Sequence, residues 1–190
     1  MINEIFYVTG RGGSISEGLG VFLRDRAKQI SGISLSNQFL ATRFEDQLSE
    51  IVKHFERIER ERIPVIANSY GAYLLLNSLI GLPQLRTKVL LLSPVVGILV
   101  SKIGYFKPPH KARIPIALAD KNLLKPEHLA IFVGRLDYQC DLEALGQIAE
   151  KLAADRFSVI EGQGHMIDPQ IVKVAVDAFL AENMIETTTT

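Results

Sequence analysis

Three residues of this 190-residue sequence have the types needed for nucleophilic catalysis at a serine: Ser69, Asp137 and His165. A serine hydroxyl is a poor nucleophile unless a base accepts its proton and a third group orients that base. Backbone N–H donors must then stabilise the oxyanion that forms when the serine attacks a carbonyl. The segments around these residues decide whether they can meet.

Ser69 lies in the stretch VIANSYGA, where an apolar run ends and a helical pattern begins. A nucleophile at a tight turn from strand to helix has an unfavourable backbone conformation and needs small residues two positions before and after it. Ala67 and Gly71 meet that requirement. The alternative is an ordinary N-cap serine, whose hydroxyl accepts a hydrogen bond from the first turn of the helix. This segment alone does not separate the two interpretations.

Asp137 lies in VGRLDYQCD, four residues beyond the end of a predicted strand at 129–133. We predict that it is the acid that orients the base. A surface turn aspartate is the alternative interpretation of this residue. Asp141 is a rival acid, but it immediately precedes a predicted helix and fits an N-cap.

His165 lies in EGQGHMID after a predicted strand at 156–160, and we predict that it is the base. Gly162 and Gly164 allow backbone conformations that other residues resist, which leaves the imidazole in an open loop. The other histidines lie on a predicted helix, just before a strand and in a proline-rich segment (His54, His128 and His110).

The loop TGRGGS at 9–14 follows the first predicted strand and exposes backbone N–H groups. We predict that it donates to the oxyanion through Gly10, Arg11 or Gly12, together with the N–H of Tyr70. A phosphate cradle is the alternative. The loop does not complete G-x-G-x-x-G, because Ile15 occupies the position of the third glycine, and the lysine of a P-loop is absent.

Short apolar runs alternate with segments of helical period, which predicts an α/β protein with a mostly parallel central sheet and helices on both faces. The carboxyl ends of parallel strands meet at one edge of a sheet, where ligands bind, and each candidate residue follows such an end. The six predicted strands are 4–8, about 33–36, 63–67, 88–92, 129–133 and 156–160.

Apolar residues spaced by three and four predict one amphipathic helix through 44–58, and further helices are expected at 70–80, 141–153 and 168–183. Residues 94–127 interrupt the alternation and are rich in proline, so we expect an excursion of short helices that covers the site as a small lid. Residues 186–190 are expected to form a frayed tail.

The bulk composition predicts a single domain over residues 1–190. The formal net charge is zero, which argues against a nucleic-acid partner, and no apolar run is long enough to span a membrane. The single cysteine, Cys140, excludes an intramolecular disulfide and a cysteine-based zinc cluster, and it is compatible with the cytoplasm. We expect no metal and no cofactor, and the composition leaves the oligomeric state open.

Residues 2 to about 183 resemble a compact member of the α/β-hydrolase superfamily, of the small esterase type. A-N-S-Y-G stands for the G-x-S-x-G elbow, G-R-L-D for the acid loop and G-Q-G-H for the histidine loop. Ala67 replaces the first glycine of the elbow, Asn68 stands where many relatives have histidine, and so does Thr9 in the oxyanion loop. These departures leave the three candidate residues in place.

The resemblance implies a hydrolase that cleaves an ester or thioester of a small or medium acyl group through an acyl-enzyme. A non-catalytic binding protein on the same scaffold is the rival interpretation. Six cations against one acidic residue in the segment 101–125 suggest anionic substrates, although a solvated surface would have the same composition. The six are Lys102, Lys107, Lys111, Arg113, Lys121 and Lys125.

Overall fold

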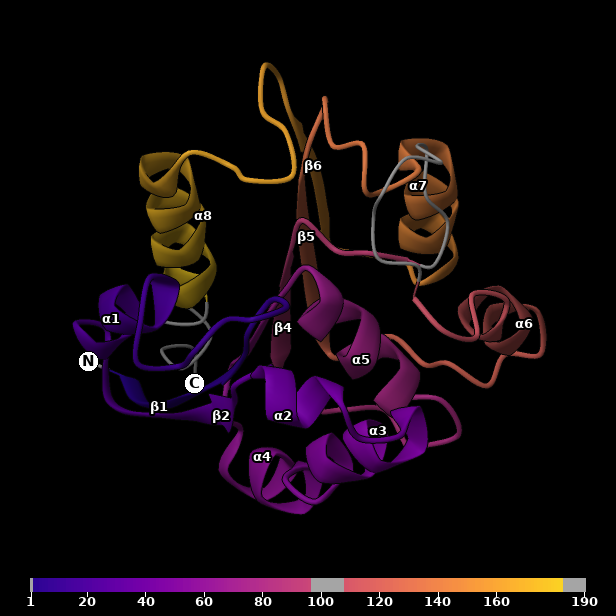
Figure 1. The fold of residues 1–190 in the computed structure, drawn as a ribbon, viewed down its shortest axis with the longest axis horizontal. Helices are drawn as coiled ribbons and strands as arrows, with labels where there is room; N and C mark the ends of the chain where they lie inside the picture. The colour runs from indigo at the N-terminus through magenta and orange to yellow at the C-terminus, as the bar shows by residue number, and fades with distance from the viewer. Residues whose placement is uncertain (1, 97–107, 183–190) are drawn as a thin grey trace, which may run out of the picture.

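The computed structural model describes residues 2–96 and 108–182, whose six strands form one parallel sheet (Figure 1). The order across the sheet is β2-β1-β3-β4-β5-β6, so β3, the strand that leads to Ser69, is central. The chain first adds β2 on one side of β1 and then adds β3 to β6 in succession on the other side. The predicted α/β class is confirmed. The strands are β1 (Ile2–Val8), β2 (Ala27–Ile33), β3 (Val65–Asn68), β4 (Lys88–Leu92), β5 (His128–Gly134) and β6 (Arg156–Ile160).

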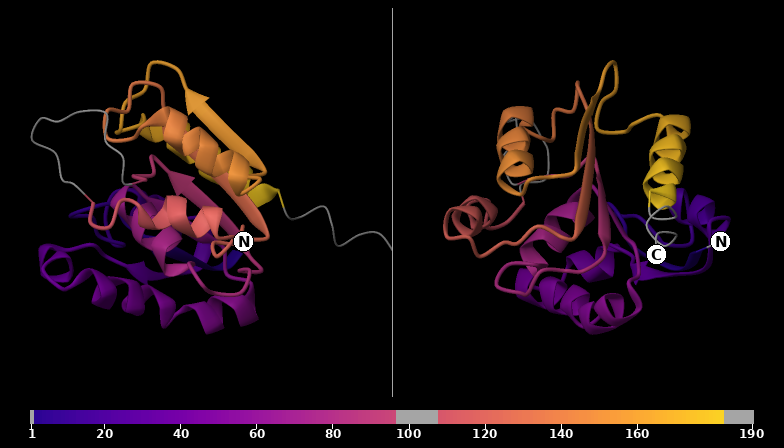
Figure 2. Two further views of the ribbon diagram at one scale, coloured as in Figure 1. Left: turned by 90° about the vertical axis from the view of Figure 1, so that its right-hand side faces the viewer. Right: turned by 180° about the vertical axis from the view of Figure 1, so that it is seen from behind.

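Helices cover both faces of the sheet, as predicted. The helices α1 (Leu19–Arg24) and α8 (Pro169–Ala181) pack on one face, and the other helices pack on the opposite face (Figures 1 and 2). These are α2 (Asn37–Leu40), α3 (Phe44–Val52), α4 (Phe55–Glu61), α5 (Tyr70–Ser78), α6 (Arg113–Ala119) and α7 (Leu142–Lys151).

Alternate residues of the strands enter two separate hydrophobic clusters. In β1, Phe6 and Val8 belong to the cluster under α3, α4, α5 and α7, whereas Ile5 and Tyr7 belong to the cluster under α1 and α8. Side chains of a strand point alternately to the two faces, so a strand covered on both sides is apolar at every position. This explains why the central strands read as unbroken apolar runs.

The prediction for the second strand was wrong. The expected strand at about 33–36 shares only Ile33 with β2, which spans Ala27–Ile33 and pairs with β1. The error follows from the position of β2 at the edge of the sheet, where Lys28 and Gln29 are exposed and the apolar density is low. Residues 34–36 instead connect β2 to α2, where Ser36 is the N-cap.

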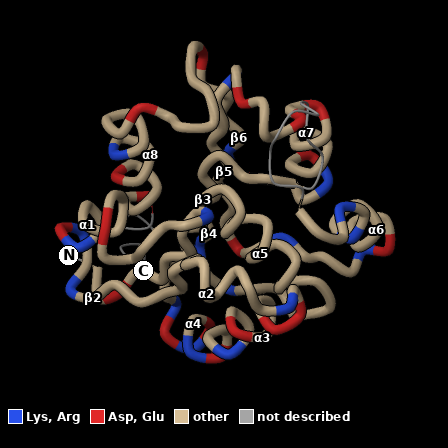
Figure 3. The backbone as a smooth tube through the Cα atoms, viewed as in Figure 1, with Lys and Arg blue, Asp and Glu red and all other residues tan. Residues whose placement is uncertain are grey.

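The predicted single helix through 44–58 is two helices, α3 and α4, separated by a turn at Lys53 and His54. All five apolar residues used for that prediction are buried, because a turn that preserves the spacing keeps them on the same side. They are Phe44, Leu48, Ile51, Phe55 and Ile58. Acidic and basic residues alternate with each other along these two helices (Figure 3).

Residues 97–107 of the proline-rich excursion lie outside the described residues, as do 183–190, which include the expected tail. The described remainder of the excursion contains α6, which contacts α5 and α7. The Tyr73 hydroxyl donates a hydrogen bond to the Pro109 carbonyl and so joins this segment to α5. Within the described ranges, no helix is both long and apolar enough to cross a membrane.

Candidate active site

Ser69 occupies the sharp turn between β3 and α5 in a strained backbone conformation, with φ 53° and ψ −120°. A non-glycine residue rarely adopts positive φ, and the strain persists only where its surroundings enforce it. The Ser69 N–H donates to the Leu92 carbonyl at 2.9 Å, and the Ser69 carbonyl accepts from Val95 at 3.3 Å. The turn is therefore held from both sides by the end of the neighbouring strand.

The Ser69 hydroxyl makes no capping hydrogen bond to α5, although the residue occupies the N-cap position. Its Oγ lies 2.8 Å from Nε2 of His165 instead. The capping function that Ser69 lacks is performed by aspartate in two other helices, Asp141 at α7 and Asp168 at α8. The N-cap interpretation of Ser69 therefore does not describe this structure.

Small residues bring α5 close to the end of β1. A methyl group on Gly71 would lie 2.2 Å from the Thr9 carbonyl oxygen and 2.8 Å from that of Val8. Ala67, on the other side of the serine, is fully buried. The requirement for small side chains therefore comes from backbone atoms of β1, which cannot move aside.

His165 lies between Ser69 and Asp137. Its Nδ1 is 2.9 Å from Oδ2 of Asp137, and the carboxylate of Asp137 is completely buried. An ionised carboxylate only accepts hydrogen bonds, so Nδ1 carries the ring proton and Nε2 is left to accept from the serine. The three candidates come from loops 96 and 28 residues apart in sequence. The fold brings all three together.

Asp137 and Asp141 have different partners. Asp137 Oδ1 accepts from the Gln139 N–H at 2.8 Å, so its second oxygen is also bonded. Asp141 Oδ1 accepts from the N–H groups of Glu143 and Ala144, both at 3.0 Å, and caps α7. Of the two aspartates, Asp137 is the one that contacts the histidine.

The acid loop and the histidine loop touch through their backbones. The Leu136 N–H donates to the Gln163 carbonyl at 2.8 Å. A methyl group on Gly134 would lie 2.3 Å from the Gly164 carbonyl oxygen and 2.4 Å from that of Gln163. The short distance between the Asp137 carboxylate and the His165 ring thus depends on Gly134, the glycine at the end of β5.

The glycine-rich loop after β1 packs directly beside the serine. A methyl group on Gly10 would lie 3.3 Å from Ser69 Cβ. The predicted donors of this loop are not equally available to an oxyanion. The Gly12 N–H already donates to the Leu35 carbonyl at 2.8 Å. Tyr70 is the first residue of α5, where N–H groups point out of the helix terminus. Of the four predicted oxyanion residues, Gly10, Arg11 and Tyr70 therefore remain candidates after Gly12 is excluded.

A cavity of about 770 Å³ opens at Ser69 and His165. It runs between the glycine-rich loop with α1 on one side and the start of α8 on the other. Among its lining residues are the three charged residues Arg11, Glu17 and Lys173. Its apolar lining includes Tyr7, Leu19, Phe22, Leu92, Ile167, Pro169 and Val172.

Burial also sets the protonation of two groups close to the site. Burial raises the pKa of the Tyr7 hydroxyl to about 12, although a hydrogen bond with Asn68 opposes the shift. Burial raises the pKa of the Cys140 thiol still further, with the charges of Asp137 and Asp141 adding to the effect. Cys140 is therefore a neutral thiol and no rival to Ser69 as nucleophile.

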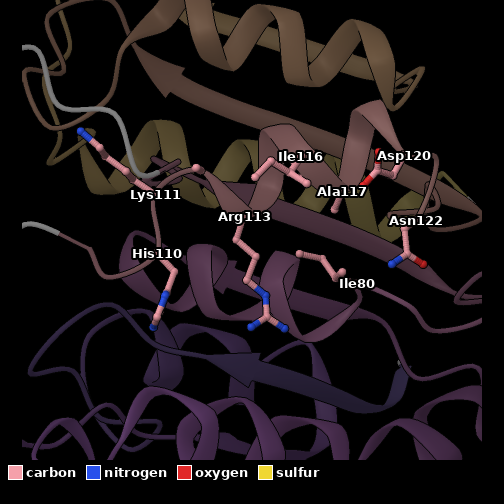
Figure 4. Close-up of a pocket in the computed structure, with 9 residues that line it drawn as sticks. Ile80, His110, Lys111, Arg113, Ile116, Ala117, Asp120 and Asn122 are labelled. Atoms are coloured by element: carbon pink, nitrogen blue, oxygen red, sulfur yellow. The ribbon is translucent and has the colours of Figure 1, made fainter.

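The described cations of the excursion do not line the cavity at Ser69. Lys111 and Arg113 line a second cavity of about 540 Å³ beside α6, together with His110 and Ile80 (Figure 4). Arg113 and His110 extend to the same side there, whereas Lys111 extends away from them. Lys125 pairs with Asp155 at 2.9 Å. Lys102 and Lys107 lie outside the described residues.

Two contributors to the site were missed by the sequence analysis. Thr9 holds the glycine-rich loop, since its Oγ1 accepts from the Leu35 N–H at 2.9 Å and lies 3.1 Å from the Gly13 carbonyl. Ser93 lines the cavity with φ 43°, a second strained serine next to the elbow. The dipeptide Ser93–Pro94 directly after an apolar strand was the available signal for a turn there.

We find no group of three or more His, Cys, Asp or Glu side chains arranged to bind a metal ion in the part of the chain that the structure describes. The contacts described above make Ser69, His165 and Asp137, with the backbone donors beside them, the candidate residues of this site.

The sequence matches no protein-family model and no curated protein, but solved structures resemble its fold. The ydeN product of B. subtilis has a TM-score of 0.63 and 18% identity, with 94% of this chain and 98% of that chain covered. A monoacylglycerol lipase of Paleococcus ferrophilus has a TM-score of 0.67 and 16% identity, with 93% of each chain covered. The esterase Est2 of Thermogutta terrifontis, solved with propionate, has a TM-score of 0.66 and 15% identity, with 100% of this chain and 86% of that chain covered.

Proposed function

Because the chain has the α/β-hydrolase fold, we propose that it is a serine hydrolase that cleaves an ester or thioester of a small or medium acyl group. One observation carries the proposal: the strained Ser69 directs its hydroxyl to His165, which contacts the buried Asp137. Structural neighbours that are named as an esterase and a monoacylglycerol lipase support the same chemistry. The single cysteine fits a cytoplasmic location, which we include in the proposal.

The first half-reaction is acyl transfer to the enzyme. His165 accepts the hydroxyl proton through Nε2 while Ser69 Oγ attacks the carbonyl carbon, and the resulting imidazolium gives this proton to the leaving alcohol or thiol. Asp137 stabilises the imidazolium and keeps its ring oriented through the bond to Nδ1. In the second half-reaction, a water molecule repeats the attack on the acyl-enzyme and releases the acid.

The oxyanion is stabilised by the N–H of Tyr70 and by the backbone of Gly10 and Arg11, which complete our proposal for the binding residues. Donors aimed at a developing negative charge lower the barrier by more than they lower the energy of the substrate. Gly10 is suited to this position because its lack of a side chain leaves room for a carbonyl oxygen near Ser69. The reaction needs no cofactor.

The proposal is tested by intact mass measurement after incubation with a fluorophosphonate, followed by peptide mapping. We expect one adduct on Ser69 in the wild-type protein and none in Ser69→Ala. Hydrolysis of p-nitrophenyl butyrate should fall by roughly 10³-fold or more in the same variant. A folded wild-type protein that forms no adduct and hydrolyses no ester would favour the binding-protein alternative.

A further inference from the structure

The charged residues of the active-site cavity are not equivalent. Arg11 and Glu17 lie on the exposed loop that follows β1, whereas Lys173 is partly buried on α8. Lys173 Nζ lies 5.5 Å from the centre of the Phe22 ring, which also lines the cavity. An aromatic face attracts a cation but supplies no negative charge.

A second cation beside the same ring makes a useful comparison. The Arg26 guanidinium lies 3.5 Å from the centre of the Phe22 ring, and Asp177 accepts hydrogen bonds from it at 2.9 and 3.2 Å. The charge of Arg26 is thus compensated by a carboxylate. Over residues 2–96 and 108–182, Lys173 forms no ion pair with a carboxylate.

We propose that Lys173 binds an anionic group of the substrate, a carboxylate or a phosphate, so that the preferred esters carry a negative charge away from the scissile bond. This rests on the proposed hydrolase function. A partly buried cation has lost part of its hydration, so an anion that enters the cavity pairs with it more strongly than with a fully exposed lysine. The cavity that holds Ser69 also holds Lys173, so one substrate can reach both.

Glu17 should act in the opposite direction. It is the acidic residue among those that line the cavity, and its charge repels the anion that Lys173 attracts. The excursion cations that the structure describes should have no such effect, because they lie outside this cavity and Lys111 lines the other one. Selectivity for an anion is therefore expected to follow Lys173 and Glu17, and not Lys111 or the other described cations of the excursion.

The test compares two esters of equal length, p-nitrophenyl pentanoate and mono-p-nitrophenyl glutarate, which differ in one terminal carboxylate. We expect the ratio of kcat/KM for the glutarate to that for the pentanoate to fall about tenfold in Lys173→Met, the loss typical of one hydrogen bond to a charged group. Methionine is unbranched and apolar like the stem of lysine, so this substitution removes the charge with little loss of apolar surface. Glu17→Gln should raise the ratio, and the matched control Lys111→Met should leave it unchanged.

A second pair, acetylglycerol phosphate and acetylglycerol, separates the two anions. A larger effect of Lys173→Met on this pair identifies a phosphate, and a larger effect on the glutarate identifies a carboxylate. Equal ratios in the wild-type protein and Lys173→Met for both pairs would overturn the inference. In that case a fluorophosphonate adduct on Ser69 would leave the hydrolase proposal standing, whereas absence of adduct and hydrolysis would reject both.

Discussion

At the scale of single residues, the backbone of Ser69 carries the feature that most separates a nucleophile from a cap. Its φ of 53° with ψ of −120° is a conformation that costs a non-glycine residue about 1–3 kcal/mol. A capping serine needs no such conformation, because the N-cap normally lies in the extended region. Ser36 and Asp141 follow that rule, with ψ of 163° and 109°.

The strain at Ser69 predicts that activity and stability oppose each other at this position. Replacing Ser69 by glycine should raise the free energy of unfolding by about 1–2 kcal/mol, because glycine adopts positive φ without the steric cost. Ser69→Ala should abolish hydrolysis equally but keep the strain, and it serves as the control. Urea unfolding of the three proteins makes the comparison, and equal stability of the two variants would contradict the prediction.

Substitution by asparagine should have very different effects on kcat at the two aspartates of the acid loop. Asp137→Asn should lower kcat by about 10³- to 10⁴-fold, because an amide favours the wrong tautomer of His165. Asp141→Asn should leave kcat nearly unchanged, because asparagine caps a helix as well as aspartate does. The measurement is the steady-state hydrolysis of p-nitrophenyl butyrate. A large loss of kcat in Asp141→Asn alone would reverse the assignment.

At the scale of elements, close contact between α5 and the end of β1 positions the serine. Gly71 is placed where a methyl group would meet backbone oxygens of Val8 and Thr9, so the helix must retreat if any side chain is added. Because Ser69 begins this helix, such a retreat also moves the hydroxyl away from His165. The packing of one glycine and the geometry of the site are thus linked.

A comparison of two helical glycines tests the link between packing at Gly71 and the position of Ser69. Gly71→Ala should destabilise the protein by about 1–3 kcal/mol, as overpacking does, and should reduce the rate of fluorophosphonate labelling. Gly146→Ala in α7 is the control, since its methyl group would meet the Phe157 ring at an ordinary 3.9 Å. That substitution should stabilise the protein by up to about 1 kcal/mol through helix propensity. Thermal unfolding measures both, and a stable, fully labelled Gly71→Ala would refute the argument.

At the scale of the whole molecule, the site lies where both hydrophobic clusters reach the same edge of the sheet. The cluster under α1 and α8 includes Tyr7, which lines the cavity, and the other cluster includes Tyr70 and Ala67 at the elbow. The stability of the site is therefore coupled to packing on both faces. Titration of Tyr7 reports on its burial in the cluster under α1 and α8.

Burial of Tyr7 predicts a loss of stability in alkali. Its pKa is raised from 10.0 to about 12, so between these pH values the unfolded chain ionises while the folded chain remains neutral. The free energy of unfolding should therefore fall as pH rises from about 10 to 12, and should fall less steeply in Tyr7→Phe. Tyr138→Phe, at an exposed position, is the control. Burial also raises the pKa of Tyr70 to about 12, but Tyr70 is present in all three proteins and does not affect the comparison.

Urea unfolding at several alkaline pH values gives the slopes. Tyrosinate absorbance provides an independent measurement, because burial raises the pKa of both Tyr7 and Tyr70 to about 12 and one of these two late ionisations should disappear from the titration of Tyr7→Phe. Equal slopes in the wild-type protein and Tyr7→Phe would show that Tyr7 is not protected from ionisation in the folded state.

The sequence alone determined the α/β class, the central strands and the residue types at the ends of those strands. These properties are local: apolar runs of strand length, Gly and Ala around Ser69, and glycines before His165 are visible without any knowledge of contacts. The edge strand β2 escaped detection because Lys28 and Gln29 lower its apolar density. The turn between α3 and α4 escaped detection because it preserves the spacing of the buried residues.

Only the tertiary structure decided which neighbouring groups touch. Asp137 and Asp141 lie four residues apart in one loop, and their difference lies in whether the carboxylate meets His165 or the first turn of α7. The same holds for Gly12, whose N–H is directed to Leu35, and for Lys173, which shares the cavity with Ser69. Hydrogen bonds extend about 3 Å and depend on direction, so segments far apart in sequence must be packed before their partners are defined.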